Sequence, residues 1–434
     1  MKHEAVELLS RYIQFDTTVP PGNERLAVDF FADLFDREGV SFKTYEADAG
    51  RASIRAVLPG SGRKDPIILL NHIDVVPADR SAWHFDPFGG EVRDGYILGR
   101  GTLDMKGQGI MELLAFLAMK RGGMSLNRDL IFLATADEEA LGFKGVKYLL
   151  DNYPEDFRAD FVLNEGGIGV SGIVPGGPLM MIATAEKGPC WLRLTRSGPS
   201  GHGSMPHGEN ALERMVQALH RLFSKEMPLT VTPIVAEYLM NLGIGHRVPK
   251  EASADERNEG IIGALKESGY IAVPQVAAMV KNTISLNSLH AGVKTNVIPG
   301  QAEADLDIRL LPGQRIEDMV QYVRDVLADD AIAVHQMLGN EANESPKDTE
   351  YYRIIDTVLL EHFPGAVVSP SLLVGTSDSR FFREKGILSY GITPIVISLQ
   401  EVGLIHGVDE RISVDNLLKG TEVTTDLVRR LCSY

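Results

Sequence analysis

The sequence predicts an α/β protein in which one sheet domain is interrupted by an inserted module. Three observations lead to this prediction. Unbroken apolar runs of strand length, such as residues 67–70 and 130–134, are separated by stretches with helical spacing. After about residue 186 the order becomes strand, helix, strand, strand, helix, strand, and the first pattern returns after residue 348. A chain of 434 residues is also too long for one compact core, so two domains are expected.

The elements of the sheet domain follow from the spacing of apolar residues. Helical spacing predicts packing helices over residues 3–15 and from the turn at 19–24 to about residue 38. Alternation predicts strands at residues 42–47 and 53–58. The later helices of this domain are predicted at residues 107–120, 142–151, 351–362 and 414–431, with a further strand at 395–399.

The inserted module has its own set of predicted elements. Strands are expected at residues 190–197, 282–286, 302–310 and 331–338, and helices at 210–223 and 316–327. The segment at residues 224–281 lies between the first helix and the second strand, and its periodicity is weak. The sequence assigns no role to this segment.

Polar side chains follow three apolar runs at the point where each run ends. The runs span residues 67–70, 130–134 and 160–163, and their lack of alternation is typical of buried parallel strands. Open α/β sheets place their chemistry at the carboxyl ends of such strands, so these side chains should meet at one edge. They are His72, Asp74, Glu138, Glu139 and Glu165.

Imidazole and carboxylate groups at one sheet edge predict a divalent metal site. The carboxylates would repel each other and would be costly to desolvate unless a cation held them. Two metals that share one bridging carboxylate, each with one imidazole and one further carboxylate, would use five ligands with none left over. Any single member could instead be a helix cap or a structural histidine, but the set favours a metal site. The five candidates are His72, Asp104, Glu139, Glu165 and His406.

The adjacent residues Glu138 and Glu139 need different tasks, because neighbouring side chains point in different directions. With Glu139 as a metal ligand, Glu138 is left as the general base that takes a proton from water. A solvated acidic pair is the alternative. Asp74 lies two residues beyond His72 and could orient that imidazole.

Composition excludes several classes of function. The net charge of −16 argues against nucleic acid or an anionic membrane as a partner. No run approaches the roughly 20 apolar residues of a membrane span, and the first residues lack the apolar core of a signal peptide. The two cysteines lie far apart, so no disulfide framework is expected. We therefore expect a cytoplasmic protein that acts on small molecules.

Ordered motifs along nearly the whole chain resemble those of a known family. They read NHIDVVP at 71–77, GRGTLDMKG at 99–107, DEE at 137–139, NEG at 164–166, GHGSMP at 201–206 and TNVIPG at 295–300. The sequence resembles the dinuclear zinc amidohydrolases and exopeptidases that include aminoacylase-1, acetylornithine deacetylase, succinyl-diaminopimelate desuccinylase, carboxypeptidase S and glutamate carboxypeptidase.

The resemblance implies a domain organisation and an oligomeric state. A zinc-exopeptidase-like α/β catalytic domain would comprise residues 1–185 and 342–434. Residues 186–341 would form an inserted ferredoxin-like lid and dimerisation domain, and the protein would be a homodimer through this lid.

The resemblance also implies a cofactor of two zinc ions, which cobalt or manganese could replace. His72 and Glu165 would hold one ion, Glu139 and His406 would hold the other, and Asp104 would bridge them. A cis peptide bond is implied directly after Asp104.

Further site residues are implied around the lid. His202 would reach the active site of a partner subunit and stabilise the tetrahedral oxyanion. Asn296 and Arg309 match positions near that site, and Arg309 or Arg380 could clamp a substrate carboxylate with paired hydrogen bonds. Gly375 would let the backbone approach the substrate. Each arginine could equally be a surface side chain, and Gly375 could be a turn residue.

The implied activity is zinc-dependent hydrolysis of an amide or peptide bond next to a free carboxylate. The substrate would be an N-acyl amino acid or a short peptide, and Glu at position 165 favours deacylation. The alternative is a dedicated biosynthetic deacylase of the succinyl-diaminopimelate desuccinylase or acetylornithine deacetylase type. A non-catalytic metal-binding protein of the same fold is a third hypothesis, which the presence of Glu138 and all five ligands disfavours.

Overall fold

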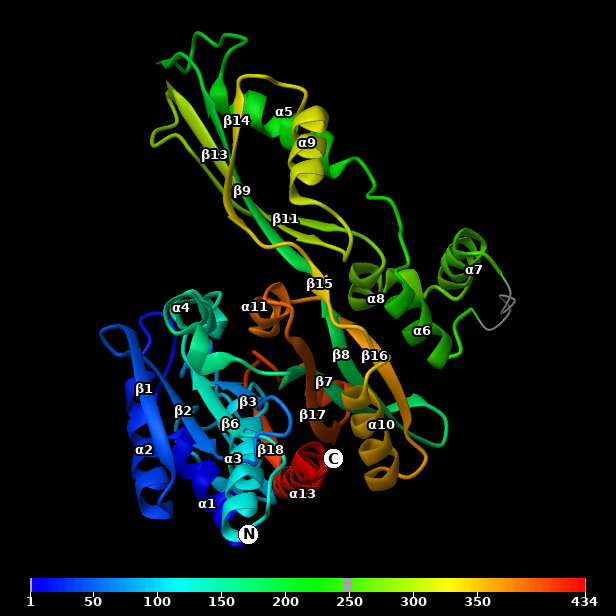
Figure 1. The fold of residues 1–434 in the computed structure, drawn as a ribbon. Helices are drawn as coiled ribbons and strands as arrows, with labels where there is room; N and C mark the ends of the chain where they lie inside the picture. Colours follow the sequence, from blue (N-terminus) through cyan, green and yellow to red (C-terminus); the bar gives the residue numbers. More distant parts are fainter. Residues whose placement is uncertain (1, 246–251, 434) are drawn as a thin grey trace. The chain divides into compact units, whose positions relative to one another are not determined.

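The computed structural model describes residues 2–245 and 252–433, and these divide into two compact units (Figure 1). The first unit consists of Met1–Thr184, Ser345–Ser371 and Ser377–Tyr434. The second unit consists of Ala185–Glu344 and Leu372–Thr376. Each unit has its own hydrophobic core.

A mixed sheet forms the centre of the first unit, with the strand order β1-β2-β6-β3-β7-β17-β8 and with β16 also paired to β8. Strands β3, β6, β7 and β17 pair in parallel, whereas β1 and β2 add to the edge antiparallel. The mixed α/β architecture predicted from the sequence is therefore confirmed. The strands are β1 (Ser41–Asp48), β2 (Arg51–Leu58), β3 (Ile67–His72), β6 (Leu130–Thr135), β7 (Phe161–Val174), β8 (Gly177–Glu186), β16 (Val367–Leu373) and β17 (Leu388–Ile397).

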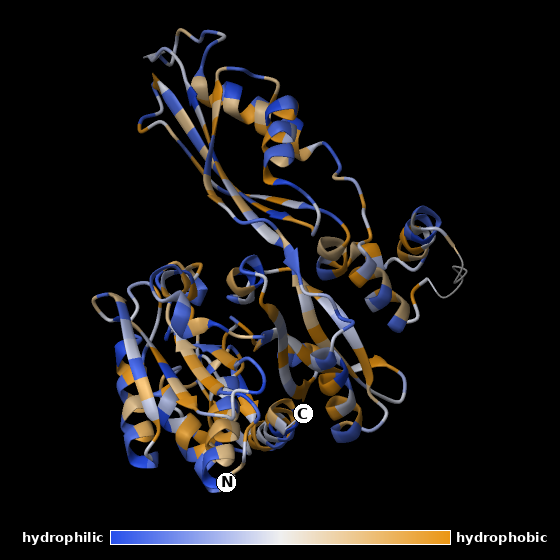
Figure 2. Ribbon diagram, viewed as in Figure 1, coloured by the Kyte–Doolittle hydropathy of each residue, from blue (hydrophilic) through white to orange (hydrophobic). Residues whose placement is uncertain are grey.

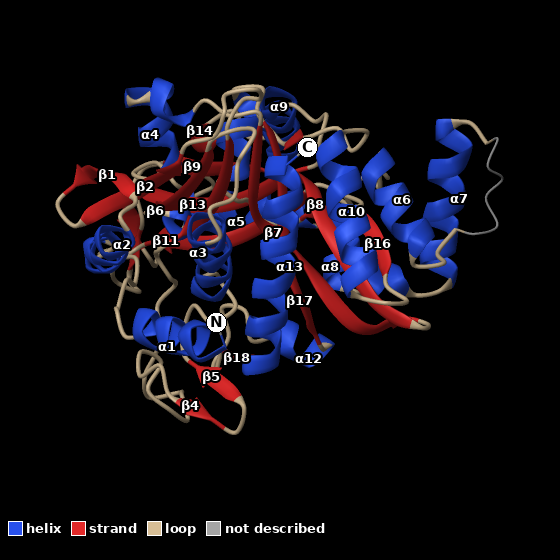
Figure 3. Ribbon diagram, turned by 60° about the horizontal axis from the view of Figure 1, so that its bottom comes forward, coloured by secondary structure: helices blue, strands red, loops and turns tan. Residues whose placement is uncertain are grey.

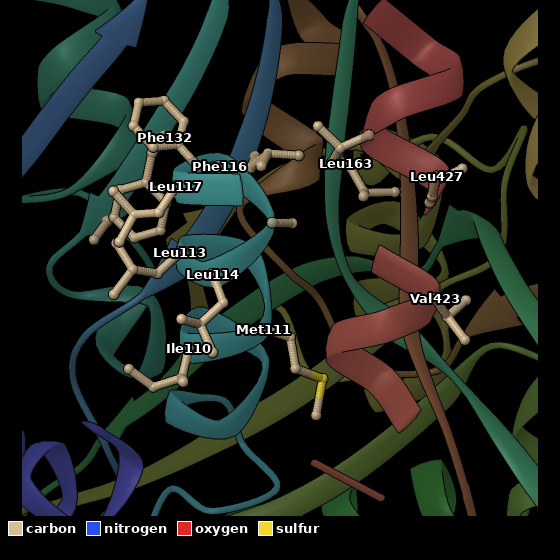
Figure 4. Close-up of a cluster of buried hydrophobic side chains, with 14 of the residues drawn as sticks. Ile110, Met111, Leu113, Leu114, Phe116, Leu117, Phe132, Leu163, Val423 and Leu427 are labelled. Atoms are coloured by element: carbon tan, nitrogen blue, oxygen red, sulfur yellow. The ribbon is translucent and has the colours of Figure 1, made fainter. Parts of the chain in front are cut away.

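Helices cover this sheet, and one of them is buried on all sides except in its last turn. Helix α3 carries apolar residues around most of its circumference and lies beside α13 (Figure 3). Figure 4 shows Leu113 and Leu117 of α3 near Phe132 of β6, in the same cluster as Val423 of α13. The helices of this unit are α1 (Lys2–Ile13), α2 (Arg25–Glu38), α3 (Lys106–Arg121), α4 (Val146–Asn152), α10 (Glu350–His362), α11 (Ser379–Glu384), α12 (Leu399–Val402) and α13 (Val414–Ser433).

A small three-stranded sheet lies outside the central one and brings two distant segments together. It has the order β18-β5-β4, from β4 (Val92–Arg93), β5 (Tyr96–Leu98) and β18 (Arg411–Ser413). Because Arg411 pairs with Leu98, the chain just before β18 lies beside the chain just after β5.

The second unit contains a four-stranded antiparallel sheet with the order β11-β13-β9-β14. Two amphipathic helices, α5 and α9, bury their apolar faces in the same cluster as this sheet (Figure 2). The six predicted elements are present in the predicted order. They are β9 (Gly188–Ser197), α5 (Ala211–Phe223), β11 (Thr283–Ala291), β13 (Gln301–Leu310), α9 (Ile316–Leu327) and β14 (Ile332–Gly339).

The segment at residues 224–281 forms a small helical group with a core of its own. The helices described in this segment are α6 (Pro233–Asn241), α7 (Ala254–Glu267) and α8 (Pro274–Met279). Val235 and Leu239 of α6 and Ile261 and Leu265 of α7 are buried in one cluster. Two short pairings, β10 (Gly201–His202) with β12 (Val297–Ile298) and β15 (Asn343–Glu344) with the end of β8, complete the unit. None of the helices described is both long and apolar enough to cross a membrane.

A buried carboxyl group lies directly behind the end of β3. Glu112 of α3 accepts hydrogen bonds from Asn71 Nδ2 and from Gln108 Nε2, both at 2.9 Å. Burial raises the pKa of Glu112 to about 8. The folded protein therefore keeps a proton on Glu112 at pH values where the unfolded chain has lost it.

This shift predicts a pH dependence of stability that Glu112→Gln should remove. Because the folded pKa of about 8 exceeds the ordinary value of 4.5, the contribution of Glu112 is full below pH 4.5 and is lost as the pH rises to about 8. The free energy of unfolding of the wild type should fall relative to Glu112→Gln by up to about 1.4 kcal/mol per pH unit in this window. Urea unfolding at pH 5, 6.5 and 8 measures it, with the exposed Glu155→Gln as control. Parallel curves for wild type and Glu112→Gln would contradict the prediction.

Candidate metal centre

The predicted ligands come from separate segments of the first unit, and the parallel register of the sheet explains why they meet. His72 ends β3 and pairs in register with Thr135, the last residue of β6. The residues after Thr135 therefore leave the sheet at the same edge. Glu138 and Glu139 follow there in a single 3₁₀ turn, η1 (Glu138–Ala140).

Glu165 reaches this edge in a way that the sequence did not predict. The apolar run was expected to end at residue 163, but β7 continues to Val174. Its first residues pair with β3 on one side, whereas β17 pairs with it from Phe161 to Val170 and β8 pairs with its second half. Glu165 therefore lies where β3 no longer pairs with β7. The predicted strand end is wrong, because partners later in the chain extend the strand.

Asp104 lies between two imidazoles. Its Oδ1 is 3.0 Å from His72 Nε2, and its Oδ2 is 3.0 Å from His406 Nε2. The outer positions are taken by Glu165, whose Oε1 is 3.5 Å from His72 Nε2, and by Glu139, whose Oε1 is 3.1 Å from His406 Nε2. Each imidazole therefore has the central carboxylate on one side and a further carboxylate beside it. The peptide bond after Asp104 is cis, as the resemblance implied.

Two groups at this edge have ligand atoms close enough to hold a metal ion. The atoms of His72, Asp104 and Glu139 all lie within 4.8 Å of one another, and so do those of His72, Glu138 and Glu165. Imidazole nitrogen and carboxylate oxygen are the donors that zinc and other divalent first-row metals accept in proteins. The donor set therefore fits a metal centre.

The imidazoles show how strongly negative this edge is. Burial acts to lower the pKa of His72, but the charges of Glu165 and Asp104 outweigh it and raise the pKa well above its usual value. Hydrogen bonding to Asp104 and to Glu139 raises the pKa of His406 to about 10. Without a metal, the two imidazoles would take up protons and act as the cations of the cluster.

Three carboxyl groups of the site have shifted pKa values. The pKa of Asp104 is lowered, which favours the anion, whereas the pKa values of Glu138 and Glu165 are raised. Burial acts to raise the pKa of Asp104, but its hydrogen bonds with His406 and His72 outweigh it and lower the pKa. Burial raises the pKa of Glu138, and the charge of Glu165 raises it further. Burial and the charge of Asp104 raise the pKa of Glu165 in the same way. A divalent cation would supply the positive charge that this cluster lacks.

Asp74 supports the site through its backbone and side chain separately. His72 Nδ1 lies 2.9 Å from the Asp74 carbonyl oxygen, so Nδ1 carries the proton and Nε2 keeps its lone pair for a metal. The Asp74 carboxylate is 3.8 Å from that nitrogen and instead accepts the backbone N–H groups of Glu138 (3.1 Å) and Glu139 (2.9 Å). It holds the turn that presents both glutamates.

A second buried carboxylate fixes the same turn, and sequence reasoning missed its partners. Asp137 has a φ of 73°, in the left-handed region that a residue with a side chain seldom adopts. Its Oδ1 accepts from Arg51, which also pairs with the buried Glu24, and its Oδ2 accepts from the Lys144 backbone N–H at 2.8 Å. The position of Asp137 within the DEE motif was a usable signal, but nothing local marks Arg51 or Glu24.

Arg100 and Glu410 were also missed, although Arg100 lies inside the GRGTLDMKG motif. Their side chains form a buried ion pair with a distance of 2.6 Å between Arg100 Nη1 and Glu410 Oε2. Arg100 also contacts the backbone of His406, and Glu410 contacts the backbone of Asp104.

Arg380 is the one predicted substrate ligand in the first unit, and its guanidinium donates to two backbone carbonyls. Nη1 donates to Ser377 at 2.9 Å, and Nη2 donates to Leu141 at 2.6 Å. The side chain is buried and ties the loop after Glu139 to the start of α11. These contacts give Arg380 a part in shaping the site.

The remaining predicted site residues belong to the second unit. They are His202, Asn296, Arg309 and Gly375. His202 and Asn296 are neighbours there, because the Gly203 N–H donates to the Asn296 carbonyl at 2.8 Å. His202 is exposed, and its Nδ1 lies 2.7 Å from Ser204 Oγ. Arg309 of β13 donates from Nε to Asp307 at 2.7 Å. A Cβ added to Gly375 would meet no atom within 4 Å, so tight packing does not require glycine at that position.

Comparison with known proteins places the chain among enzymes with this kind of site. A family model, Peptidase family M20/M25/M40, matches residues 68–430. N-fatty-acyl-amino acid synthase/hydrolase PM20D1 of Xenopus tropicalis is 33% identical over 355 residues, which are 80% of this chain and 69% of that protein. Aminoacylase-1 of Mus musculus is 26% identical over 445 residues, with 100% of this chain and 96% of that protein covered.

Solved structures agree with this assignment at the level of the fold. The M20 family metallo-carboxypeptidase Sso-CP2 from Sulfolobus solfataricus has a TM-score of 0.75 at 18% identity, and 98% of each chain is covered. The family match spans every predicted ligand from His72 to His406. The chain therefore belongs to peptidase family M20/M25/M40, a family of metallopeptidases and amidohydrolases.

Proposed function

We propose that this protein hydrolyses the amide bond of N-acyl amino acids and releases the free amino acid. The observation that carries the proposal is the placement of Asp104 with one oxygen 3.0 Å from each of two imidazoles. Two relatives whose names describe action on N-acyl amino acids or aminoacylase activity, PM20D1 and aminoacylase-1, support this choice of substrate. Glu165 supports it as well, because the family resemblance implies glutamate at this position in members that cleave N-acyl amino acids and aspartate in many dipeptidases.

The proposed cofactor is a pair of zinc ions, for which cobalt or manganese could substitute. His72 and Glu165 would hold one ion, Glu139 and His406 the other, and Asp104 would contact both. When bound, two such ions polarise a substrate carbonyl and lower the pKa of water. The Asp74 carbonyl fixes the tautomer of His72 that leaves Nε2 available as a ligand.

Glu138 is the proposed general base. It shares one group of neighbouring ligand atoms with His72 and Glu165, and the Asp74 carboxylate fixes its backbone. Its carboxylate would take a proton from the attacking water, while the water oxygen forms a bond to the carbonyl carbon. The same proton would then pass from Glu138 to the amide nitrogen as the C–N bond breaks. The products are the free acid and the free amino acid.

The second unit is the proposed lid, with a ferredoxin-like sheet that would pair with a second copy of the chain. Its strand order β11-β13-β9-β14 and the two helices α5 and α9 support this topology. His202 would donate to the oxyanion of the tetrahedral intermediate. The Ser204 hydroxyl beside its Nδ1 supports a fixed orientation of the ring.

Recognition of the substrate carboxylate is proposed for Arg309, and Asn296, in the same unit but beyond the opposite end of β13, is a separate candidate. Arg309 holds Asp307 with Nε and Nη2, at 2.7 and 3.1 Å, so a substrate carboxylate would have to displace Asp307 to receive the same paired hydrogen bonds. Arg380 remains the second candidate, although two of its donors are directed at backbone carbonyls. Gly375 would allow the backbone to approach the substrate, and the open space at its Cβ position supports this.

The activity should be detected as release of free amino acid from N-acyl substrates, and it should depend on metal. A panel of N-acetyl, N-succinyl and long-chain N-acyl amino acids and dipeptides is incubated with the protein before and after chelation. We expect chelation to abolish cleavage and added zinc, cobalt or manganese to restore it. Strict preference for one acetyl or succinyl substrate would instead indicate a dedicated biosynthetic deacylase. No cleavage by protein that binds two metal ions would contradict the proposal.

Replacing the general base should slow the reaction without removing the metal. Glu138→Gln cannot accept a proton, so kcat should fall by about 10²- to 10⁴-fold. Metal content, measured by atomic absorption, should stay at the wild-type value. Glu91→Gln, at an exposed carboxylate of the same unit, is the matched control. Full turnover by metal-loaded Glu138→Gln would exclude this residue as the base.

Replacing His202 should raise the free energy of the transition state more than that of the bound substrate. His202→Gln should lower kcat by about 10²-fold and change KM little, because the proposed contact forms only with the developing oxyanion. The matched control is His335→Gln, an exposed histidine of β14 in the same unit. A rise in KM at unchanged kcat would show that His202 binds the substrate instead.

A further inference from the structure

Arg100 and Glu410 connect the loop that carries Asp104 with the loop that carries His406. Neither residue contacts substrate or metal in the proposed mechanism. Arg100 and Glu410 are 3% and 0% exposed in their side chains and are separated by 310 positions in the chain. The small sheet formed by β5 and β18 brings them together, since Leu98 pairs with Arg411. A buried ion pair is in general weak support for stability, so its other contacts indicate what it does.

Glu410 gathers the backbone of the loop that carries Asp104. Its Oε2 accepts the Gly101 N–H at 3.0 Å in addition to Arg100. Its Oε1 accepts the N–H groups of Leu103 at 2.7 Å and of Asp104 itself at 3.1 Å. This loop has no regular secondary structure between β5 and α3, so the carboxylate supplies acceptors for three N–H groups that a strand or helix would otherwise pair with carbonyls.

Arg100 does the same for the loop that carries His406. Its Nη2 donates to the carbonyl oxygens of His406 at 3.2 Å and of Gly407 at 2.9 Å. His406 has a φ of 58°, a left-handed conformation that persists in a residue with a side chain only where surrounding contacts enforce it. The guanidinium supplies two of those contacts.

We propose that Arg100 and Glu410 are positioning residues that set the separation of Asp104 and His406 and thereby the affinity for the metal ion between them. This inference rests on the proposed function, in which Asp104, Glu139 and His406 are ligands. Groups that orient metal ligands typically change metal affinity by about 10- to 100-fold when they are replaced. Glu410 acts on the shared ligand Asp104, whereas Arg100 reaches His406 directly. The two residues should therefore affect the two metal ions differently.

The test is the stepwise zinc affinity of Arg100→Lys, measured by competition with a chromophoric chelator. Lysine keeps the charge beside Glu410 but cannot also donate to two carbonyls in the geometry of the guanidinium. We expect one of the two ions to bind roughly 10- to 100-fold more weakly and the other to bind as in the wild type. Activity at limiting zinc should fall, and excess zinc should restore it.

The matched control is Arg128→Lys, the same substitution at another buried arginine of the first unit. Arg128 donates to Tyr351 Oη at 2.9 Å and lies beside Asp160 and Glu350, all of which are outside the ligand loops. It should shift the melting temperature of the metal-free protein without changing zinc affinity. Wild-type affinity for both ions in Arg100→Lys, or an equal loss of affinity in Arg128→Lys, would overturn the proposal.

Glu410→Gln provides a second variant if Arg100→Lys does not fold. Glutamine has the same shape as glutamate but only one acceptor oxygen, whereas the backbone N–H groups of Gly101, Leu103 and Asp104 are shared between the two oxygens of Glu410. Some of these N–H groups would lose their acceptor, so the Asp104 loop should become less rigid. Because Asp104 is the shared ligand, both ions should bind more weakly, and unchanged affinity for both would overturn the proposal. A wild-type protein that binds fewer than two ions would instead refute the proposed metal centre, so the two failures are distinguishable.

Discussion

Mutual repulsion among carboxylates at one sheet edge is the constraint on which the rest of this site depends. Asp104, Glu138, Glu139 and Glu165 all lie there, and burial raises the pKa of Glu138 and Glu165. Such a cluster persists only if the backbone that carries it is held firmly and if positive charge is available. The protein supplies the first condition itself, and a divalent metal centre would satisfy the second.

The firm backbone comes from other buried carboxylates, which act on N–H groups rather than on the ligand side chains. Asp74 accepts from Glu138 and Glu139, and Glu410 accepts from Leu103 and Asp104. A buried carboxylate can accept several hydrogen bonds, so one residue can organise a whole irregular loop. Ligands in loops thereby gain a rigidity that is usual for ligands on helices or strands.

The same arrangement explains why membership of the M20/M25/M40 family and the geometry of the site agree. The family match runs from residue 68 to residue 430, and it includes the loop-holding residues Asp74, Arg100 and Glu410 as well as the proposed ligands. Parallel strands β3, β6 and β7 provide the common edge, and helix α3, buried along most of its length, begins two residues after Asp104. The fold and the site are therefore built from one set of segments.

Local patterns in the sequence were enough to predict the α/β architecture and the ligand candidates. The apolar runs that became β3 and β6 needed no tertiary information, because burial on both faces leaves an unbroken run of large apolar residues. In the structure the side chains that follow β3 and β6 lie at one edge of the sheet. The elements of the second unit were recognised from a different local pattern, because β9 and β13 alternate between buried and less buried residues and α5 and α9 are amphipathic.

Only the tertiary structure decided which groups hold the site together. It showed that the Asp74 carboxylate binds the Glu138–Glu139 turn, that Arg380 donates to Leu141, and that β7 continues past Glu165. The Arg100 and Glu410 pair spans 310 positions. A hydrogen bond between distant segments leaves no periodic signal in either segment, because its geometry depends on how the whole chain folds.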